Sequence, residues 1–170
     1  MKRTFVIIFS FCLLFNSYLP VEAKNTDTLP VTSTYTEYIS DDLYAEVELC
    51  ITPENANTFS THSYSKTTAA TYASTKQRTA SKTYNIKNSS GTTIGSYTLT
   101  GTFQYNGSSS ACTNTSCSTS VSNSHYYFAS KSASKSGNTA TGSFTFVDTL
   151  FGIRLTKTLT LTCSANGTIQ

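Results

Sequence analysis

Apolar and small polar residues alternate along the chain between Thr79 and Gly107. Every second position in the latter half of this stretch is apolar or glycine: Tyr97, Leu99, Gly101, Phe103 and Tyr105. Because successive side chains of a β-strand point to opposite faces, one face would be apolar and the other rich in hydroxyl groups. An earlier alternating run starts at Ala80, and Gly91 between the two runs can adopt the positive φ of a chain reversal. The pattern predicts a β-hairpin whose apolar face the rest of the chain must cover.

Similar alternation recurs towards the C-terminus at intervals of about ten residues. Three further strands are expected, at residues 118–129, 139–147 and 155–163. Turn signals separate the strands, and the clearest of them is Asn106-Gly107. Such spacing is typical of an antiparallel sandwich or barrel and not of alternating strands and helices. The sequence therefore predicts an all-β fold, with an immunoglobulin-like antiparallel β-sandwich over residues 79–170.

Residues 24–78 have a different character and are expected to form an acidic, Thr/Ser-rich N-terminal arm with one strand. Residues 24–36 are polar and contain Pro30, which indicates a flexible start. Residues 41–51 alternate and predict a strand. A short helix capped by Ser40 is the alternative, because two aspartates follow that serine.

The first 23 residues have the pattern of an export signal. Lys2 and Arg3 precede an apolar run of 15 residues from Phe5 to Leu19, and Val21 and Ala23 are the small residues of a cleavage site. A membrane-spanning helix needs about 20 apolar residues, so this run is too short for one. We expect cleavage after Ala23, a secreted chain with no transmembrane span, and any surface association to be non-covalent.

Hydroxyl residues dominate after Ala23, where 55 of 147 residues are Ser or Thr and 18 are charged. Residues 24–60 hold seven acids and one lysine, whereas residues 61–170 hold nine bases and one acid. The basic part could bind an anionic polymer, the acidic arm could lie against it, or both parts could be ordinary solvated surface. Because the bases are scattered and export is expected, nucleic acid is not an expected partner.

Four cysteines follow the predicted signal: Cys50, Cys112, Cys117 and Cys163. An even number in an exported chain predicts disulfides, and four cysteines permit three pairings. Cys163 falls on the apolar face of the last strand. Zinc would need two more soft ligands, for which only His62 and His125 exist, so neither a metal nor another cofactor is expected.

Motifs for catalysis are weak. Ser63-x-x-Lys66 and Ser132-x-x-Lys135 match a serine–lysine nucleophile pattern, but serine is so common here that chance explains both. A glycosidase needs two carboxylates, and Asp148 is the one acid after residue 60. Asp148 could instead catalyse a Lys–Asn isopeptide bond. His125 is expected to be an edge-strand residue and not a general base.

Aromatic residues offer candidate binding positions at Tyr126, Tyr127 and Phe151. Three consecutive aromatics start at Tyr126 and cannot all face the core, and Phe151 lies in an apolar connection. Exposed tyrosine rings suit sugars or protein partners, although these residues could instead close the ends of the sandwich. The expected function is a secreted, non-catalytic interaction module for a glycan, protein or cell-wall polymer. A structural or protective envelope protein is the alternative, and a small hydrolase the third.

Four segments in this order carry a resemblance to a family: residues 79–84 (TASKTY), 101–107 (GTFQYNG), 132–139 (SASKSGNT) and 159–168 (LTLTCSANGT). Residues 79–170 resemble an uncharacterised family of small exported proteins of low-GC Gram-positive bacteria, mostly gut anaerobes. The resemblance implies a β-sandwich fold and an extracellular address, but no activity. It also implies a disulfide between Cys112 and Cys163. That bond would leave Cys50 to pair with Cys117, and the local pair Cys112–Cys117 is its rival.

Overall fold

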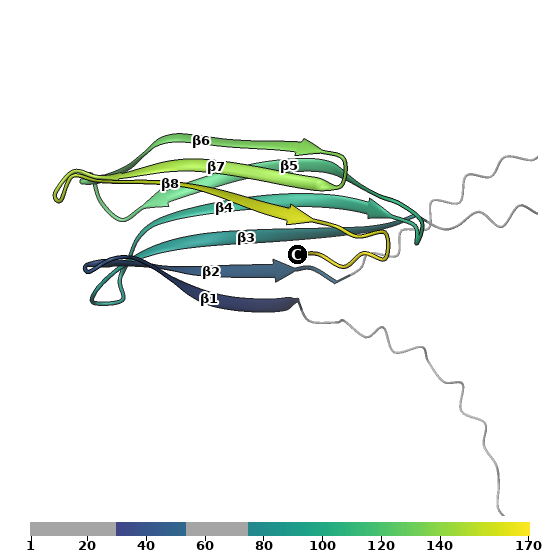
Figure 1. Ribbon diagram of the computed structural model, residues 1–170, viewed down its shortest axis with the longest axis horizontal. Coiled ribbons are helices and arrows are strands. Elements are labelled where there is room, and N and C mark those ends of the chain that lie inside the picture. The colour runs from purple at the N-terminus through teal and green to yellow at the C-terminus, as the bar shows by residue number, and fades with distance from the viewer. Residues whose placement is uncertain (1–29, 54–74) are drawn as a thin grey trace, which may run out of the picture.

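The computed structural model describes residues 30–53 and 75–170 of the 170-residue chain. These residues form eight β-strands and no helix. The strands are β1 (Val31–Ser40), β2 (Leu43–Ile51), β3 (Lys76–Asn88), β4 (Thr93–Tyr105), β5 (Ser110–Val121), β6 (Tyr126–Ser136), β7 (Thr139–Asp148) and β8 (Ile153–Thr162). Strands β1 to β5 form one antiparallel sheet and β6 to β8 form a second, which packs against the first (Figure 1). The predicted all-β sandwich is confirmed.

Neighbouring strands in each sheet are also neighbours in the sequence, in the orders β1-β2-β3-β4-β5 and β6-β7-β8. The chain thus runs up and down through each sheet and crosses between the sheets once, after β5. An immunoglobulin fold instead connects its two sheets through Greek-key crossovers. The immunoglobulin-like part of the prediction is therefore not confirmed, because alternation reveals which face a residue occupies but not which strands become neighbours.

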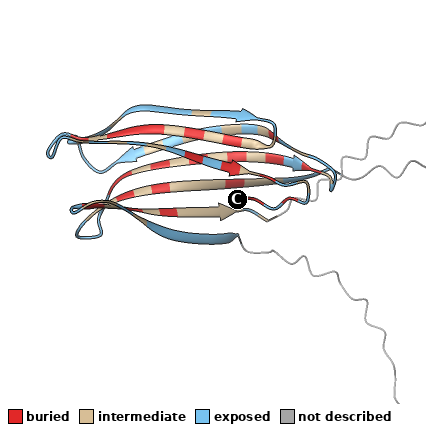
Figure 2. Ribbon diagram, in the orientation of Figure 1, coloured by how far each residue is buried: buried red, intermediate tan, exposed pale blue. Residues whose placement is uncertain are grey.

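The core lies between the two sheets, where β6, β7 and β8 cover β3, β4 and β5. We call the sheet faces that meet there the inner faces, and the solvent-facing ones the outer faces. Buried residues alternate with exposed or half-buried ones along β3, β4 and β7, as Figure 2 shows. Because three strands cover five, β1 and β2 extend beyond the smaller sheet, and β1 is exposed over most of its length.

The predicted central hairpin is confirmed. Strands β3 and β4 pair along their length, from Lys76 opposite Tyr105 to Lys87 opposite Thr93. Gly91 in the connecting turn has a φ of 84°, which a residue with a side chain rarely adopts. The alternation therefore indicated both the strands and the face that each one buries.

The N-terminal part contains two strands where one was predicted. Residues 41–51 contain a strand, as expected, and the alternative helix is not observed. Residues 31–36, expected to be flexible, belong to β1, which pairs with β2 from Val31 to Ser40. An edge strand that is exposed on both faces needs no alternation of apolar residues. The polar sequence of β1 therefore did not indicate a strand. Strands β1 and β2 belong to the same sheet as β3, and β3 begins at Lys76.

Several predictions fall outside the described residues: the export signal at residues 1–23 with its cleavage site after Ala23, His62, and the Ser63–Lys66 motif. No membrane-spanning helix occurs in the part of the chain that the structure describes.

Candidate functional site

A cleft of about 270 Å³ opens between β5 and β6, the strands that join the two sheets. Its lining comes from the last part of β5 and the first part of β6: Thr119, Ser120, Val121, Tyr127, Phe128 and Lys131. Val121 remains 42% exposed although it lies on the inner face, opposite Gly95 of β4. The cleft therefore combines apolar surface, hydroxyl groups and one ammonium group.

The three consecutive aromatics divide between core and cleft as the sequence required. Tyr126 stacks on Phe146, with ring centroids 5.8 Å apart, and Phe128 packs edge-on against the same ring at 5.4 Å. Tyr127 points to the opposite face and is 46% exposed. Of the predicted binding residues in β6, Tyr127 is available to a ligand, whereas Tyr126 contributes mainly to the core.

Lys131 contributes the positive charge of the cleft. Its Nζ donates a hydrogen bond to the Thr119 hydroxyl at 3.1 Å, which spans the gap between the two strands. A β-bulge between Phe128 and Ser130 shifts the register, so that Lys131 shares the inner face with Phe144 opposite it. This bulge explains why the sequence did not indicate Lys131: simple alternation from Phe128 puts residue 131 on the outer face.

Phe151 lies at the same end of the molecule as the cleft, in the turn between β7 and β8 (Figure 1). It is 67% exposed. The Asp148 carboxylate orders this turn by accepting hydrogen bonds from the backbone N–H groups of Leu150 at 2.8 Å and Phe151 at 3.4 Å. The structure thus places Phe151 near the cleft's end of the sandwich but not in its lining.

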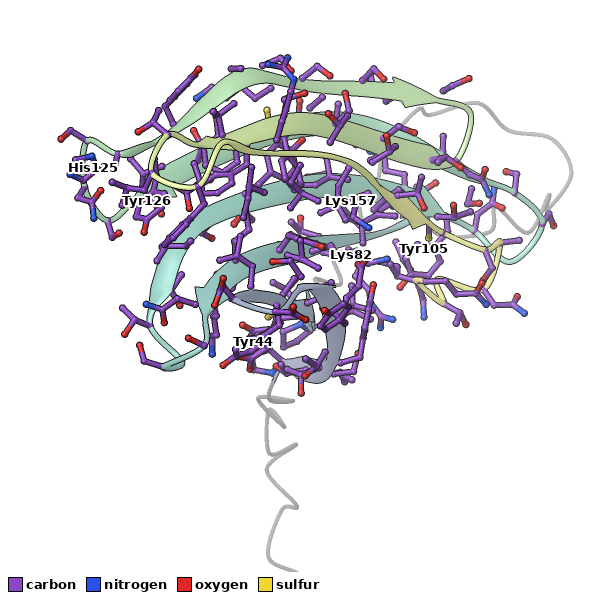
Figure 3. All side chains as sticks on the ribbon, turned by 60° about the vertical axis from the view of Figure 1, so that its left-hand side comes forward. Tyr44, Lys82, Tyr105, His125, Tyr126 and Lys157 are labelled. Carbon is purple, nitrogen blue, oxygen red and sulfur yellow. The ribbon has the colours of Figure 1, made fainter. Side chains whose placement is uncertain are left out.

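The neighbouring turn, between β5 and β6, holds His125 beside Tyr126 (Figure 3). The His125 carbonyl oxygen accepts hydrogen bonds from the backbone N–H and the hydroxyl of Thr149, at 3.0 and 2.9 Å, which joins the two turns. His125, predicted to be an edge-strand residue, therefore lies in the turn just before the edge strand β6.

The four described cysteines are thiols in this structure. The sequence led us to expect a disulfide between Cys50 and Cys117, but these two residues cannot pair. They lie in β2 and β5, three strand spacings or about 14 Å apart, whereas bonded cysteines need Cα atoms within about 7 Å. They also occupy opposite faces of the sheet, because Cys117 lies opposite buried Leu99 and Cys50 lies opposite Ser81.

The local pair Cys112–Cys117 is also excluded, since five residues of one strand span about 16 Å. Cys112 and Cys163, by contrast, are both buried and close together. Their backbone N–H groups donate to consecutive carbonyls, those of Gly137 at 2.8 Å and Asn138 at 3.1 Å. Burial raises the pKa of both thiols.

Ser132 and Lys135 do not form a catalytic pair, because they occupy opposite faces of β6. Ser132 shares a hydrogen bond of 2.8 Å with Ser143 on the outer face, while the Lys135 ammonium donates to the Thr113 carbonyl oxygen of β5. Within residues 30–53 and 75–170, no three His, Cys, Asp or Glu side chains gather as a metal site would require.

Comparisons with protein-family models, with curated proteins and with solved structures found no match for this chain.

Proposed function

We propose that this protein is a secreted, non-catalytic binding module that holds a carbohydrate of the cell envelope or of a host surface in the cleft between β5 and β6. The observation that carries the proposal is the lining of the cleft. An exposed tyrosine ring, an exposed valine, two hydroxyl residues and a lysine converge there. Tyrosine offers an apolar ring face with a polar tip, which matches a sugar ring and its hydroxyls.

The size of the cleft limits what it can enclose. Pockets for drug-sized ligands measure roughly 300–1,000 Å³, so about 270 Å³ suits a single sugar ring, with the rest of a chain lying outside. The Lys131 ammonium would donate to a sugar hydroxyl or carboxylate. Phe151, exposed at the same end of the molecule, would contact a longer ligand.

Calorimetric titration of the purified protein with soluble oligosaccharides from cell-wall polysaccharide and from mucin tests the proposal. We expect Tyr127→Ala to weaken binding about tenfold, as the loss of about 1.4 kcal/mol of aromatic contact would. Lys131→Gln should reduce the salt dependence of binding to an acidic sugar, because salt screens exposed charges.

Tyr38→Ala is the matched control, since Tyr38 is 71% exposed in β1 on the far side of the sandwich. Its affinity should equal that of the wild type. The proposal fails if neither oligosaccharide binds, or if Tyr38→Ala weakens binding as much as Tyr127→Ala. Salt-insensitive binding that survives Lys131→Gln would assign recognition to the aromatic ring alone.

A further inference from the structure

Each sheet ends in two edge strands, β1 and β5 in the larger and β6 and β8 in the smaller. Unpaired backbone groups on an edge can pair with a strand of another molecule, and inward-pointing lysines are a common protection. Lys131 and Lys135 of β6 protect the β5–β6 side in this way. They donate to the Thr119 hydroxyl and to the Thr113 carbonyl oxygen of β5.

The β8 edge is protected in the same manner. Lys82 of β3 donates to the Thr160 carbonyl oxygen of β8 at 2.9 Å. Lys157 of β8 forms an ion pair with Glu37 of β1. Both lysines thus lie between β8 and the larger sheet (Figure 3). A strand approaching β8 would have to displace charged groups that already have partners.

Strand β1 is less protected: its one charged residue, Glu37, points inward to Lys157, and a β-bulge lies near its end, between Tyr38 and Ser40. Its ten residues include neither lysine nor proline. Among the described strands it pairs with β2 alone, so no described strand covers its other edge. It also carries three large exposed apolar or aromatic side chains: Val31 at 66%, Tyr35 at 57% and Tyr38 at 71%. This strand therefore combines an edge that no described strand covers with large exposed apolar and aromatic side chains.

We propose that β1 pairs antiparallel with β1 of a second copy of this chain, so that two five-stranded sheets become one sheet of ten strands. A two-fold axis at Tyr35 sets that ring against its symmetry mate on the inner face. On the outer face, Thr34 then lies opposite Thr36 of the partner subunit. Aromatic and threonine pairs are both favourable across antiparallel strands.

Charge is compatible with this pairing, although β1 and β2 are acidic. Glu37 pairs with Lys157, and Glu46 pairs with Lys87, so two of the three glutamates in these strands have a counter-ion within their own subunit. In the register centred on Tyr35, Glu37 lies opposite Ser33 of the partner subunit and not opposite another acid.

Assembly stops at two copies, because an interface that uses the same strand in both subunits is closed. The β5–β6 clefts lie on the side of each sandwich away from β1 and stay open. Two clefts per dimer would strengthen binding to a polymer through avidity. This last consequence rests on the proposed function, whereas the dimer itself does not.

Sedimentation equilibrium of the protein, expressed from its full coding sequence, tests the dimer. The wild type should reach twice the mass of one chain as its concentration rises. Tyr35→Lys places two like charges on the two-fold axis and should leave a monomer at every concentration. Tyr127→Lys is the matched control, since it changes an exposed tyrosine of the protected edge strand β6, and it should still dimerise.

Hydrogen exchange separates the loss of the dimer from the loss of the fold. In the wild type, amides of β1 should gain protection as concentration rises, while amides of β4 stay protected throughout. In the Tyr35→Lys variant, amides of β4 should stay protected, but amides of β1 should gain no protection as concentration rises. A wild type that stays monomeric, a Tyr35→Lys variant that still dimerises, or a growing series of larger oligomers would each overturn the proposal.

Discussion

Tyr97 shows how a single residue holds the two sheets together. It lies fully buried in β4, its ring stacks on Phe144 of β7 at 4.7 Å, and its hydroxyl donates to the Ser132 carbonyl oxygen of β6 at 2.7 Å. Alternation alone placed Tyr97 on the apolar face. The acceptor, 35 residues further along the chain, could not be deduced from that pattern, because only the packing of one sheet on the other brings Ser132 there.

Buried tyrosines make the stability of this protein sensitive to high pH. Burial raises the pKa of Tyr84 and Tyr97 above the usual value of 10.0. A group whose pKa is higher in the folded state stabilises fully below its unfolded pKa, and this contribution is lost as pH rises towards the folded pKa. We expect the free energy of unfolding, measured in urea, to be steady at neutral pH and to fall above pH 10.

The Tyr97→Phe variant tests the cause. It should lose about 1 kcal/mol at neutral pH with its hydrogen bond, and its stability should fall less steeply above pH 10. Lys82, whose pKa burial lowers, titrates in both proteins and so cancels from the comparison. Equal alkaline slopes in the two proteins would refute this origin.

Aromatic residues at the candidate site were foreseen only in part. Three adjacent aromatics must divide between two faces, so the sequence required that at least one point outward. It could not say that Tyr127 would be the exposed one, because that depends on which face of β6 turns towards the larger sheet. The β-bulge after Phe128, which depends on the register with β7, turned Lys131 to the inner face, where it lines the same cleft as Tyr127.

Strands were predicted best where one face is buried. Strands β3, β4 and β7 bury alternate residues, and that burial is what alternation records. Strand β1 is exposed on both faces for most of its length, so no face of it had to be apolar. Its existence follows from pairing with β2, which is a property of the sheet and not of its own ten residues.

Glycine at position 142 allows β7 to approach β4 closely. A Cβ atom there would lie 2.2 Å from the Tyr97 hydroxyl oxygen and 2.9 Å from the Leu99 Cδ1 atom. Because Tyr97 is held by its hydrogen bond and its ring stacking, it cannot move aside freely. We expect Gly142→Ala to lower the free energy of unfolding in urea by about 1–3 kcal/mol.

Two further variants check the reason for that loss. Adding Tyr97→Phe to Gly142→Ala removes the closest atom and should recover part of the stability that Gly142→Ala loses. Thr158→Ala, at an exposed position of β8, should change stability by less than about 0.5 kcal/mol. A Gly142→Ala protein as stable as the wild type would contradict the close approach.

At the scale of the whole molecule, the uneven charge of the sequence has a structural outcome. The Glu37–Lys157 pair joins β1 to β8, and the Glu46–Lys87 pair joins β2 to β3. Each pair is partly exposed, so each stabilises by less than about 1 kcal/mol. Their effect is one of placement: they hold the acidic first strands against the basic remainder of the chain.

Cys112 and Cys163 offer a covalent link between the two halves of the sandwich. We expect protein recovered from an oxidising compartment to carry this bond, which closes a loop of about 50 residues and would stabilise by about 4 kcal/mol. Peptide mapping without reductant should recover the two cysteines joined, with Cys50 and Cys117 alkylated in denaturant. Alkylation of all four cysteines in such protein would refute the bond.

The sequence by itself determined the all-β class, the central hairpin and the face of each buried strand, because these follow from alternation and turn residues that act locally. The tertiary structure decided the order of the strands, the impossibility of a Cys50–Cys117 bond, the cleft between β5 and β6 and the position of β1 at the edge of its sheet. Each of these depends on distances between segments far apart in the chain. Such distances are fixed by strand pairing and by the packing of a smaller sheet on a larger one, which no local pattern records.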